Sequence, residues 1–418
     1  MKIKVSLTII TILLIATVPV SATSIEKPNL SQYKNDIPQL IDCYIIEGVP
    51  YVSQETNLYC AYATVTMILQ YYGIDTNLKE ILHHSGIGYV LFYSDLFYLF
   101  EEFDDYYYHA TYFRYPLSGL IFCQYDRAGL ADMFNLTYLN WSANQNECSI
   151  EKNWDEYWLK VKENVTQDVP VITSVNISYM PYTDETSGHS IVIVGFNQTH
   201  VFYNDPATAL YSNPESGYYA NISIEDFKNA VNSTPATKFK IDTFHNTSNI
   251  CYDRTEVFLK AHKRNIEKLK GVFYGADMYF FGINAARMYR LELRVGPLRR
   301  MITVSLNWDY VRQDGLLNAS FNLLSLERLN VSQYLIENQD LSKEICTHDG
   351  SLLENESKCW KKITECITEL QNISKKHGRL LTLILSFSIT RKIRAELNKI
   401  ILIQKALIKG PSSILSVV

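Results

Sequence analysis

One pair of adjoining segments constrains the fold of this chain more than any other feature. Residues 187–196 begin polar and then run apolar almost without a break, 197–200 form a polar turn, and 201–206 return. A strand that is apolar at successive positions is buried on both of its faces. We therefore predict a hairpin inside a sheet, with His189 at the start of the first arm and Asp205 at the end of the second.

The hairpin brings two chemically useful side chains together. His189 and Asp205 are 16 residues apart and lie at the same end of neighbouring strands. A carboxylate at that place can hold an imidazole in one tautomer. Asn204 stands beside Asp205, and because sequence does not fix the register to one residue, it is a second candidate for this orienting role.

A cysteine begins the most regular helix that the sequence predicts. Residues 60–72 contain no Gly or Pro, and the apolar positions 61, 65, 68, 69 and 72 fall on one helical face. Gly73 follows where a left-handed cap is expected, and Asn57 is a suitable N-cap. Cys60 therefore lies in the first turn, where free N–H groups and the helix dipole favour a thiolate.

The residue types now form a familiar chemical set. Gln54 precedes Cys60 by six residues, and its amide can point at an oxyanion that forms beside the sulfur. A nucleophile at a helix start, a histidine at a strand start and a carboxylate behind it make the Cys–His–Asp arrangement of nucleophilic catalysis. A buried strand at 170–175 follows an amphipathic helix at 155–165 and completes the expected sheet region.

Four spaced motifs carry a resemblance to a known family. They are Val49-Pro50-Tyr51-x-x-Gln54 with Tyr59-Cys60, Met67-Ile68-Leu69-x-Tyr71-Tyr72-Gly73, Gly188-His189-Ser190-Ile191-Val192-Ile193-Val194-Gly195, and Asn204-Asp205-Pro206. Over about residues 45–240 the chain resembles papain-like cysteine peptidases, most closely the bacteriocin-processing (double-glycine leader) peptidases and their stand-alone relatives.

The resemblance implies a fold and a set of roles. The fold is α+β and papain-like, with an N-terminal helix that carries the cysteine packed on an antiparallel sheet that carries the histidine. By that resemblance Cys60 is the nucleophile, His189 the general base, Asp205 its orienter and Gln54 the oxyanion donor. A peptide or protein is then the substrate, and no cofactor is required.

Two departures qualify the resemblance. Those peptidases usually carry glycine after the cysteine, whereas Ala61-Tyr62 follows here, and the larger ring is expected to narrow the cleft. The stretch 78–93, with its sequence His84-Ser85-Gly86-Ile87-Gly88, is similar to the N-terminal domain of the butirosin biosynthesis protein H group, whose members are linked to acyl transfer. An acyltransferase that uses the same three residues is therefore one alternative, and a non-catalytic peptide-binding or surface module is another.

The first residues of the chain indicate export. A short basic start, an apolar run and small residues at 20–22 predict a signal peptide over residues 1–22 and a secreted or cell-surface protein. No later segment is long and apolar enough for a transmembrane helix, so none is expected in the mature chain. Thirteen Asn-x-Ser/Thr sites agree with export, because such sites mark surface loops of secreted glycoproteins.

The cysteines of an exported chain favour disulfides. There are eight, and a free nucleophile at Cys60 leaves seven, so a second thiol must also be free if pairing is internal. Cys359 and Cys366 lie seven residues apart in a helical stretch, about 10.5 Å along its axis, which is too far for a bond between them. Either one can pair with Cys346.

Charge divides the chain into two parts. Residues 1–254 carry 14 basic and 28 acidic residues, and 255–418 carry 25 and 16. We predict a peptidase-like domain over 40–248 and a mainly helical domain over 255–418, whose basic excess can dock on the acidic part, bind an anionic cell-surface polymer or face solvent. The overall charge of −5 excludes a dedicated nucleic-acid binder.

No metal site is expected. His83 and His84 are neighbours on a predicted helix and should point in different directions, and no other His or Cys spacing fits a zinc motif.

Overall fold

The computed structural model is divided into two units, residues 1–41 and residues 42–418, and the second unit holds nearly all of the described residues. The predicted boundary between 248 and 255 falls inside the second unit and stays a prediction, and the predicted signal peptide lies outside the described residues. The structure describes residues 41–56, 59–89, 91–95, 114–118, 127–143, 150–184, 186–211, 217–234, 238–246, 252–270, 280–295, 316–376 and 379–411.

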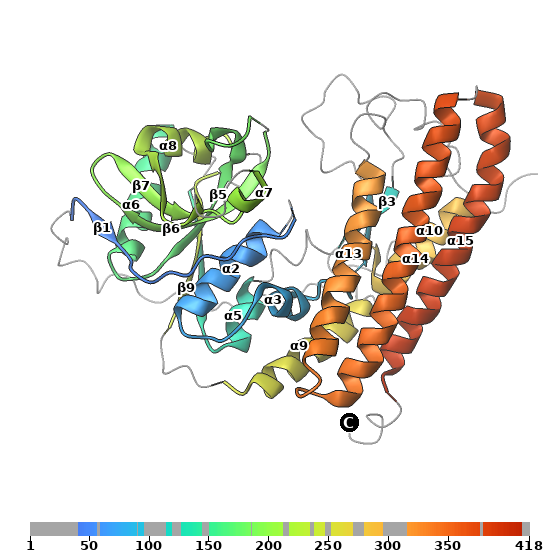
Figure 1. Ribbon diagram of the computed structural model, residues 1–418. Coiled ribbons are helices and arrows are strands. Elements are labelled where there is room, and N and C mark those ends of the chain that lie inside the picture. The colour runs from blue at the N-terminus through green and yellow to red at the C-terminus, as the bar shows by residue number, and fades with distance from the viewer. Residues whose placement is uncertain are drawn as a thin grey trace, which may run out of the picture. The chain divides into compact units, whose positions relative to one another are not determined.

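The described residues form an α+β structure. Its largest sheet is antiparallel (Figure 1). Its path runs β4-β9-β5-β6-β7-β8, and β1 pairs with β6. The strands are β1 (Tyr44–Ile45), β4 (Thr137–Ser142), β5 (Val171–Asn176), β6 (Gly188–Phe196), β7 (His200–Asn204), β8 (Ala220–Ser223) and β9 (Lys240–His245).

The predicted hairpin is confirmed as β6 and β7 at the centre of this sheet. All residues of β6 after Gly188 are buried, as a strand covered on both faces requires. The register pairs Val192 with Asn204 and shifts between Ile193 and Gly195. Gly195 is needed there, because a Cβ would meet the Tyr44 carbonyl oxygen at 2.7 Å where β1 pairs with β6.

Helices cover the sheet and form the main core with it. The cysteine-bearing helix α2 (Cys60–Tyr71) packs on β6, and α6 (Ile150–Val165) and α8 (Ile224–Asn232) pack on β5. The predicted left-handed position at Gly73 is confirmed, with φ of +79°. The remaining elements here are α3 (Leu78–Ser85), α5 (Arg127–Met133), η4 (Ile177–Tyr179) and α7 (Thr208–Tyr211).

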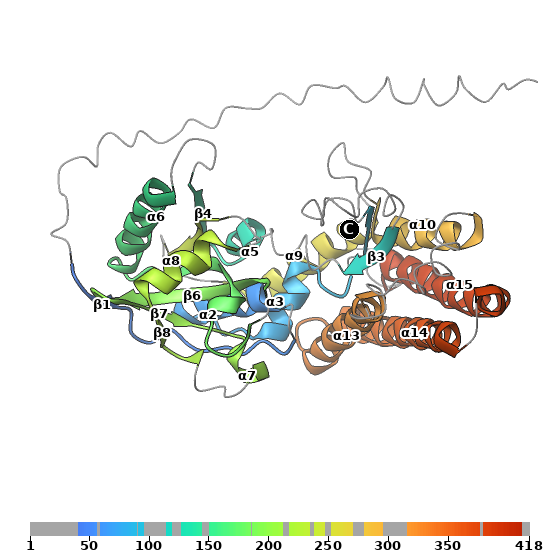
Figure 2. The same ribbon diagram turned by 90° about the horizontal axis from the view of Figure 1, so that it is seen from above.

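Long helices dominate the C-terminal half, as predicted. Helices α13, α14 and α15 pack in sequence, and α10 packs on α15 (Figure 2). A small sheet, β10-β2-β3, joins residues from both predicted domains. The bounds are β2 (Leu91–Asp95), β3 (Arg114–Ser118), α9 (Arg254–Leu269), β10 (Phe280–Phe281), α10 (Gly282–Val295), α13 (Leu316–Glu337), α14 (Lys343–Lys376) and α15 (Arg379–Lys409).

An ion-pair network is buried between the three long helices. Arg328 on α13 donates to Glu356 on α14 at 3.1 Å, and Gln404 on α15 donates to the same carboxylate at 3.2 Å. All three side chains are at most 1% exposed. The Glu356 carboxylate thus has two donors that compensate for its removal from water.

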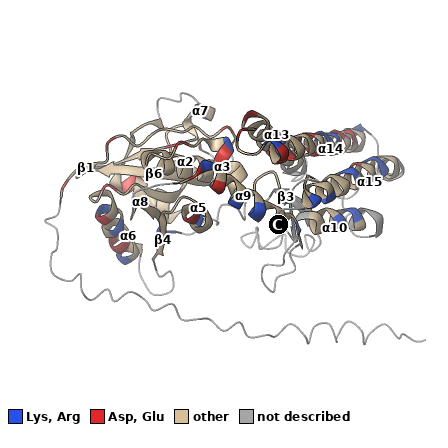
Figure 3. Cartoon of the chain, turned by 90° about the horizontal axis from the view of Figure 1, so that it is seen from below, with Lys and Arg blue, Asp and Glu red and all other residues tan. Residues whose placement is uncertain are grey.

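Charge is unevenly distributed over the helices. Lys and Arg residues recur along α10 and α15, whereas α14 mixes residues of both signs (Figure 3). No helix within the described ranges combines the length and hydropathy that a membrane crossing requires. Association with an anionic surface polymer stays a prediction.

The expected disulfides are not present among the described cysteines. Cys43, Cys60, Cys346, Cys359 and Cys366 are all free, and the other three lie outside the described residues. The proposed pairing of Cys346 with Cys359 or Cys366 was wrong because all three lie on the single helix α14. Thirteen residues of helix separate the nearer pair by about 20 Å, far beyond disulfide reach.

Among the glycosylation sites whose burial the structure describes, two are not on the surface. Asn176 at the end of β5 is 5% exposed, and Asn330 inside α13 is 6% exposed. Asn176 also uses its side-chain oxygen to accept hydrogen bonds from Ser178. The prediction that every site marks a surface loop was therefore wrong at these two positions.

His83 and His84 on α3 pack against aromatic residues that follow later in the chain. His83 stacks on Phe258 of α9, with ring centroids 5.2 Å apart, and His84 stacks on Phe134. The two rings do not diverge as predicted, because their Nδ1 atoms lie 3.2 Å apart. Both side chains are fully buried.

These histidines should make the fold sensitive to acid. Burial, reinforced by the positive charge of Arg264, lowers the pKa of His84 to about 3, and burial with the charge of His84 lowers the pKa of His83. Glu80, which lies 3.9 Å from His84, and Arg254 complete the charged surroundings. Below about pH 6.5 the unfolded chain binds protons that the folded chain excludes, so stability falls as pH falls.

Between its pKa in the unfolded chain and its lower pKa in the folded chain, His84 should reduce the free energy of unfolding by about 1.4 kcal/mol for each unit that the pH falls. Denaturant unfolding over a pH series measures this slope. His84→Phe keeps a stacked ring and should flatten the slope, whatever its effect on stability at neutral pH. An unchanged slope in the variant would show that other groups cause the acid sensitivity.

Candidate active site

Cys60 lies where the sequence places it, at the first residue of α2. The residue before the helix, Tyr59, makes no side-chain capping bond, and the expected cap Asn57 lies outside the described residues. The first N–H groups of a helix have no partner within it. Cys60 is 8% exposed, so its sulfur sits in a largely dry place close to these donors.

His189 and Asp205 reach the same place from the central hairpin. His189 is the second residue of β6, and Asp205 directly follows β7. The imidazole Nε2 lies 2.7 Å from Asp205 Oδ1, and both side chains are at most 4% exposed. The antiparallel hairpin, whose exact register the sequence left open, therefore brings the ring and the carboxylate into contact.

Asn204, the alternative orienter, has a different role. Its side-chain amide donates to the carbonyl oxygens of Val49 and Pro50, both at 3.2 Å, and its oxygen accepts from the Tyr219 backbone N–H at 2.9 Å. It ties β7 to the segment that leads towards the cysteine helix. Between the two candidates, the contact with His189 belongs to Asp205.

The three groups shift one another's protonation. Burial opposes charge at Cys60, but its hydrogen bond with His189 and the backbone N–H groups of Ser190 and Ala61 outweigh burial and lower the pKa of the thiol. Burial likewise opposes charge at His189, yet Asp205 and Cys60 raise its pKa to about 10. The pKa of Asp205 is lowered against its burial by His189, Tyr182 and the Ala207 N–H. Each shift favours the charged form of its group, which is the thiolate of Cys60, the imidazolium of His189 and the carboxylate of Asp205.

Two other described cysteines show what burial does without such partners. Burial raises the pKa of Cys346 to about 11, and burial with a hydrogen bond to Glu396 raises the pKa of Cys359 to about 12. These thiols stay protonated at neutral pH and are poor nucleophiles. A lowered pKa therefore distinguishes Cys60 from them.

Gln54 lies on the loop that enters α2. Its backbone N–H donates to the Pro206 carbonyl oxygen at 2.9 Å, which ties this loop to the residue after Asp205. The side chain is 3% exposed, and its Oε1 has no hydrogen-bond partner among the described residues. The unpartnered atom is an acceptor oxygen, whereas a donor to an oxyanion would be the Nε2 amide group of the same side chain.

Sequence reasoning missed Tyr182 and misjudged Tyr62. Tyr182 donates to Asp205 Oδ2 at 2.7 Å, although nothing in the pattern separates it from the other 29 tyrosines. Tyr62, expected to narrow the cleft, is 1% exposed and packs edge-on to Tyr59 in the main core. It is therefore a core residue.

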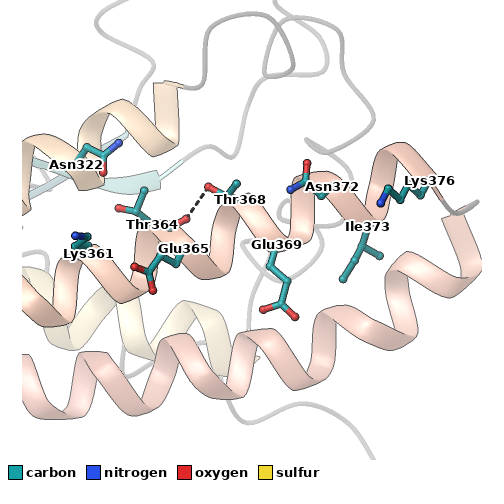
Figure 4. Close-up of a pocket in the computed structure, with 9 residues that line it drawn as sticks. All are labelled: Asn322, Lys361, Thr364, Glu365, Thr368, Glu369, Asn372, Ile373 and Lys376. Carbon is teal, nitrogen blue, oxygen red and sulfur yellow. Dashed lines mark hydrogen bonds between the residues drawn. The ribbon is translucent and has the colours of Figure 1, made fainter.

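A pocket elsewhere in the structure is lined by none of these candidate site residues. It has a volume of about 660 Å³ and is lined along α14, with one residue from α13 (Figure 4). Its lining mixes Lys361 and Lys376 with Glu365 and Glu369, and no cysteine or histidine contributes. Among the described residues, no group of three or more His, Cys, Asp or Glu side chains could hold a metal ion.

One family comparison supports the chemistry that this geometry suggests. Residues 46–234 match the model of the Peptidase_C39 like family, and the matched residues make up less than half of the chain. No curated protein matches the chain. The matched region contains Gln54, Cys60, His189 and Asp205. The similarity indicates a cysteine peptidase type of enzyme that acts on peptide or protein substrates.

Proposed function

We propose that this chain is a secreted papain-like cysteine hydrolase that cleaves peptide bonds through a thioester on Cys60. The observation that carries the proposal is the position of His189, which is buried and hydrogen-bonded to Asp205 on one side and to Cys60 on the other. Since Nε2 faces Asp205, Nδ1 is the nitrogen left for the sulfur. The similarity of residues 46–234 to the Peptidase_C39 like family supports the same reaction class.

The charges assign a role to each group. The Cys60 thiolate attacks the carbonyl carbon of the scissile amide, and the negative charge moves to the carbonyl oxygen. The Cys60 backbone N–H and the Gln54 side-chain amide are the proposed donors to that oxygen. His189, already protonated, gives its proton to the leaving amine as the C–N bond breaks.

The second half of the reaction reverses the proton flow. Once the amine has left, His189 is neutral and takes a proton from a water molecule that attacks the thioester. The tetrahedral intermediate collapses, the carboxylic acid leaves, and the thiolate–imidazolium pair returns. Asp205 keeps the ring aligned through both halves and stabilises its positive charge.

Export remains part of the proposal. The predicted signal peptide ends at Ala22, so the mature secreted chain should begin at Thr23. N-terminal sequencing of the protein from culture medium tests this directly. A protein that retains Met1 and stays inside the cell would instead favour the acyltransferase alternative, whose acyl donors are cytosolic.

A labelled-water experiment tests the reaction itself. The full chain is incubated with a diverse peptide library in water enriched in the heavy oxygen isotope. Hydrolysis places one heavy oxygen in each new C-terminal carboxylate, whereas acyl transfer to an added amine yields an unlabelled amide. Cleavage with label is the expected result, and no cleavage of any library member would contradict the proposal.

A further inference from the structure

The Asp205 carboxylate is held on both of its oxygens. Oδ1 lies 2.7 Å from His189 Nε2 and accepts from the Ala207 backbone N–H at 2.9 Å. Oδ2 accepts from the Tyr182 hydroxyl at 2.7 Å. Asp205 itself is fully buried, so these donors replace the water that an exposed carboxylate would bind.

Tyr182 comes from a loop that is fastened at its base. The loop leaves η4 and leads into β6, the strand that carries His189. At its root the Ile177 N–H donates to the Ser187 carbonyl oxygen at 3.0 Å, and the Met180 N–H donates to the Ile177 carbonyl oxygen at 2.8 Å. Met180 is 3% exposed, whereas Tyr182 is half-buried. Residues 177–184 therefore present the hydroxyl to Asp205 from a backbone that is tied to Ser187, directly before β6.

Hydrogen bonds to both oxygens have a geometric consequence. A carboxylate held at one oxygen can rotate about its Cβ–Cγ bond, and rotation would carry Oδ1 away from the imidazole. A donor at Oδ2 removes that freedom. It also stabilises the ionised carboxylate, because a hydrogen bond to a charged group is stronger than one between neutral groups.

We propose that Tyr182 is a positioning residue, which fixes the Asp205 carboxylate so that His189 stays aligned with Cys60 and protonated. This inference rests on the proposed function, because it assigns Tyr182 a part in the same reaction. Its hydroxyl donates to Asp205, so Tyr182 acts on His189 through that carboxylate. Sequence motifs do not identify it, since it lies in the polar loop between two predicted strands.

Tyr182→Phe removes one oxygen atom and keeps the ring. We expect kcat to fall about 10-fold to 100-fold, the effect of one lost hydrogen bond to a charged group, with KM little changed. With a less fixed counter-charge the imidazolium is less stable, so the alkaline limb of activity should move down from about pH 10. The pH dependence of Cys60 alkylation should correspondingly move towards higher pH.

A neighbouring tyrosine supplies the matched control. Tyr179 lies three residues earlier, is 39% exposed and makes no side-chain hydrogen bond within the described residues. Tyr179→Phe should behave like the unaltered chain in kcat, KM and both pH profiles. Equal losses in the two variants would overturn the proposal, because they would point to a general effect on the loop.

Alkylation separates this inference from the proposed function. The unaltered chain and both variants are treated with iodoacetamide across pH, and the label on Cys60 is quantified by peptide mass spectrometry. An ordinary thiol pKa at Cys60 in the unaltered chain would overturn the proposed function. A lowered pKa that is the same in the chain with Tyr182→Phe would overturn only the role of Tyr182.

Discussion

Replacement of Cys60 by alanine is expected to reduce peptide cleavage by about 10⁴-fold or more, to the level left by binding alone. No other described group can form the thioester in its place, because the thiolate depends on contact with His189. The fold should survive, since alanine is the best helix former and the change removes a single sulfur atom at a helix start.

The control for this prediction is a second buried thiol. Cys346 lies on α14, and its sulfur contacts the Asn338 carbonyl oxygen. Cys346→Ala should keep full activity, because burial raises the pKa of that thiol to about 11 and leaves it protonated. Cleavage rates and circular dichroism of both variants make the comparison. Full activity in the chain with Cys60→Ala would exclude the thioester mechanism.

Replacement of Asp205 by alanine is expected to give the second-largest loss, about 10³-fold. The buried imidazolium would lose its counter-charge, and the remaining effect of burial is to lower the pKa of His189. Activity that needs protonated His189 is present below its pKa and is lost above it. The alkaline limb should therefore fall from about pH 10 towards the ordinary histidine pKa near 6.5 or below.

Asparagine at the same position divides this effect into its parts. Asp205→Asn retains an oxygen that can accept from His189 Nε2 but removes the charge. Its loss of activity, and its shift of the alkaline limb of activity, should therefore be smaller than those of Asp205→Ala. Asp242 is a matched control, since its carboxylate is 3% exposed in β9 and contacts Tyr138 and Asn140. Asp242→Asn should change thermal stability and leave the alkaline limb in place. An alkaline limb unchanged by Asp205→Ala would contradict the role of Asp205.

The elements around the candidate site were predictable because each has a strong local pattern. The helix that begins at Cys60 shows apolar residues on one face and ends with a glycine at positive φ. The strand that carries His189 is apolar at nearly every position, which only a covered central strand satisfies. When both elements are placed, antiparallel pairing brings His189 to the same end of the sheet as Asn204 and Asp205, and the structure shows that Asp205 is the one that contacts the ring.

The rest could not be predicted because it depends on distant contacts. Tyr182 acquires its role from Asp205, 23 residues away, and its loop has no repeating pattern. Arg328 and Glu356 have the composition of solvent-facing helix positions, yet α13, α14 and α15 bury them against one another. Cys346 was expected to pair because the sequence did not show that α14 continues through it.

The measurement that tests the central claim most directly is the pH dependence of Cys60 alkylation by iodoacetamide, followed from acid pH to above pH 10. The claim is that His189 converts a buried thiol into a thiolate. We predict rapid labelling well below the ordinary thiol pKa and a second change near pH 10, where His189 loses its proton. In the chain with His189→Ala, burial alone should raise the pKa of Cys60, and labelling should begin only at alkaline pH. Identical profiles for the two chains, or an unaltered chain whose Cys60 reacts only at alkaline pH, would contradict the account.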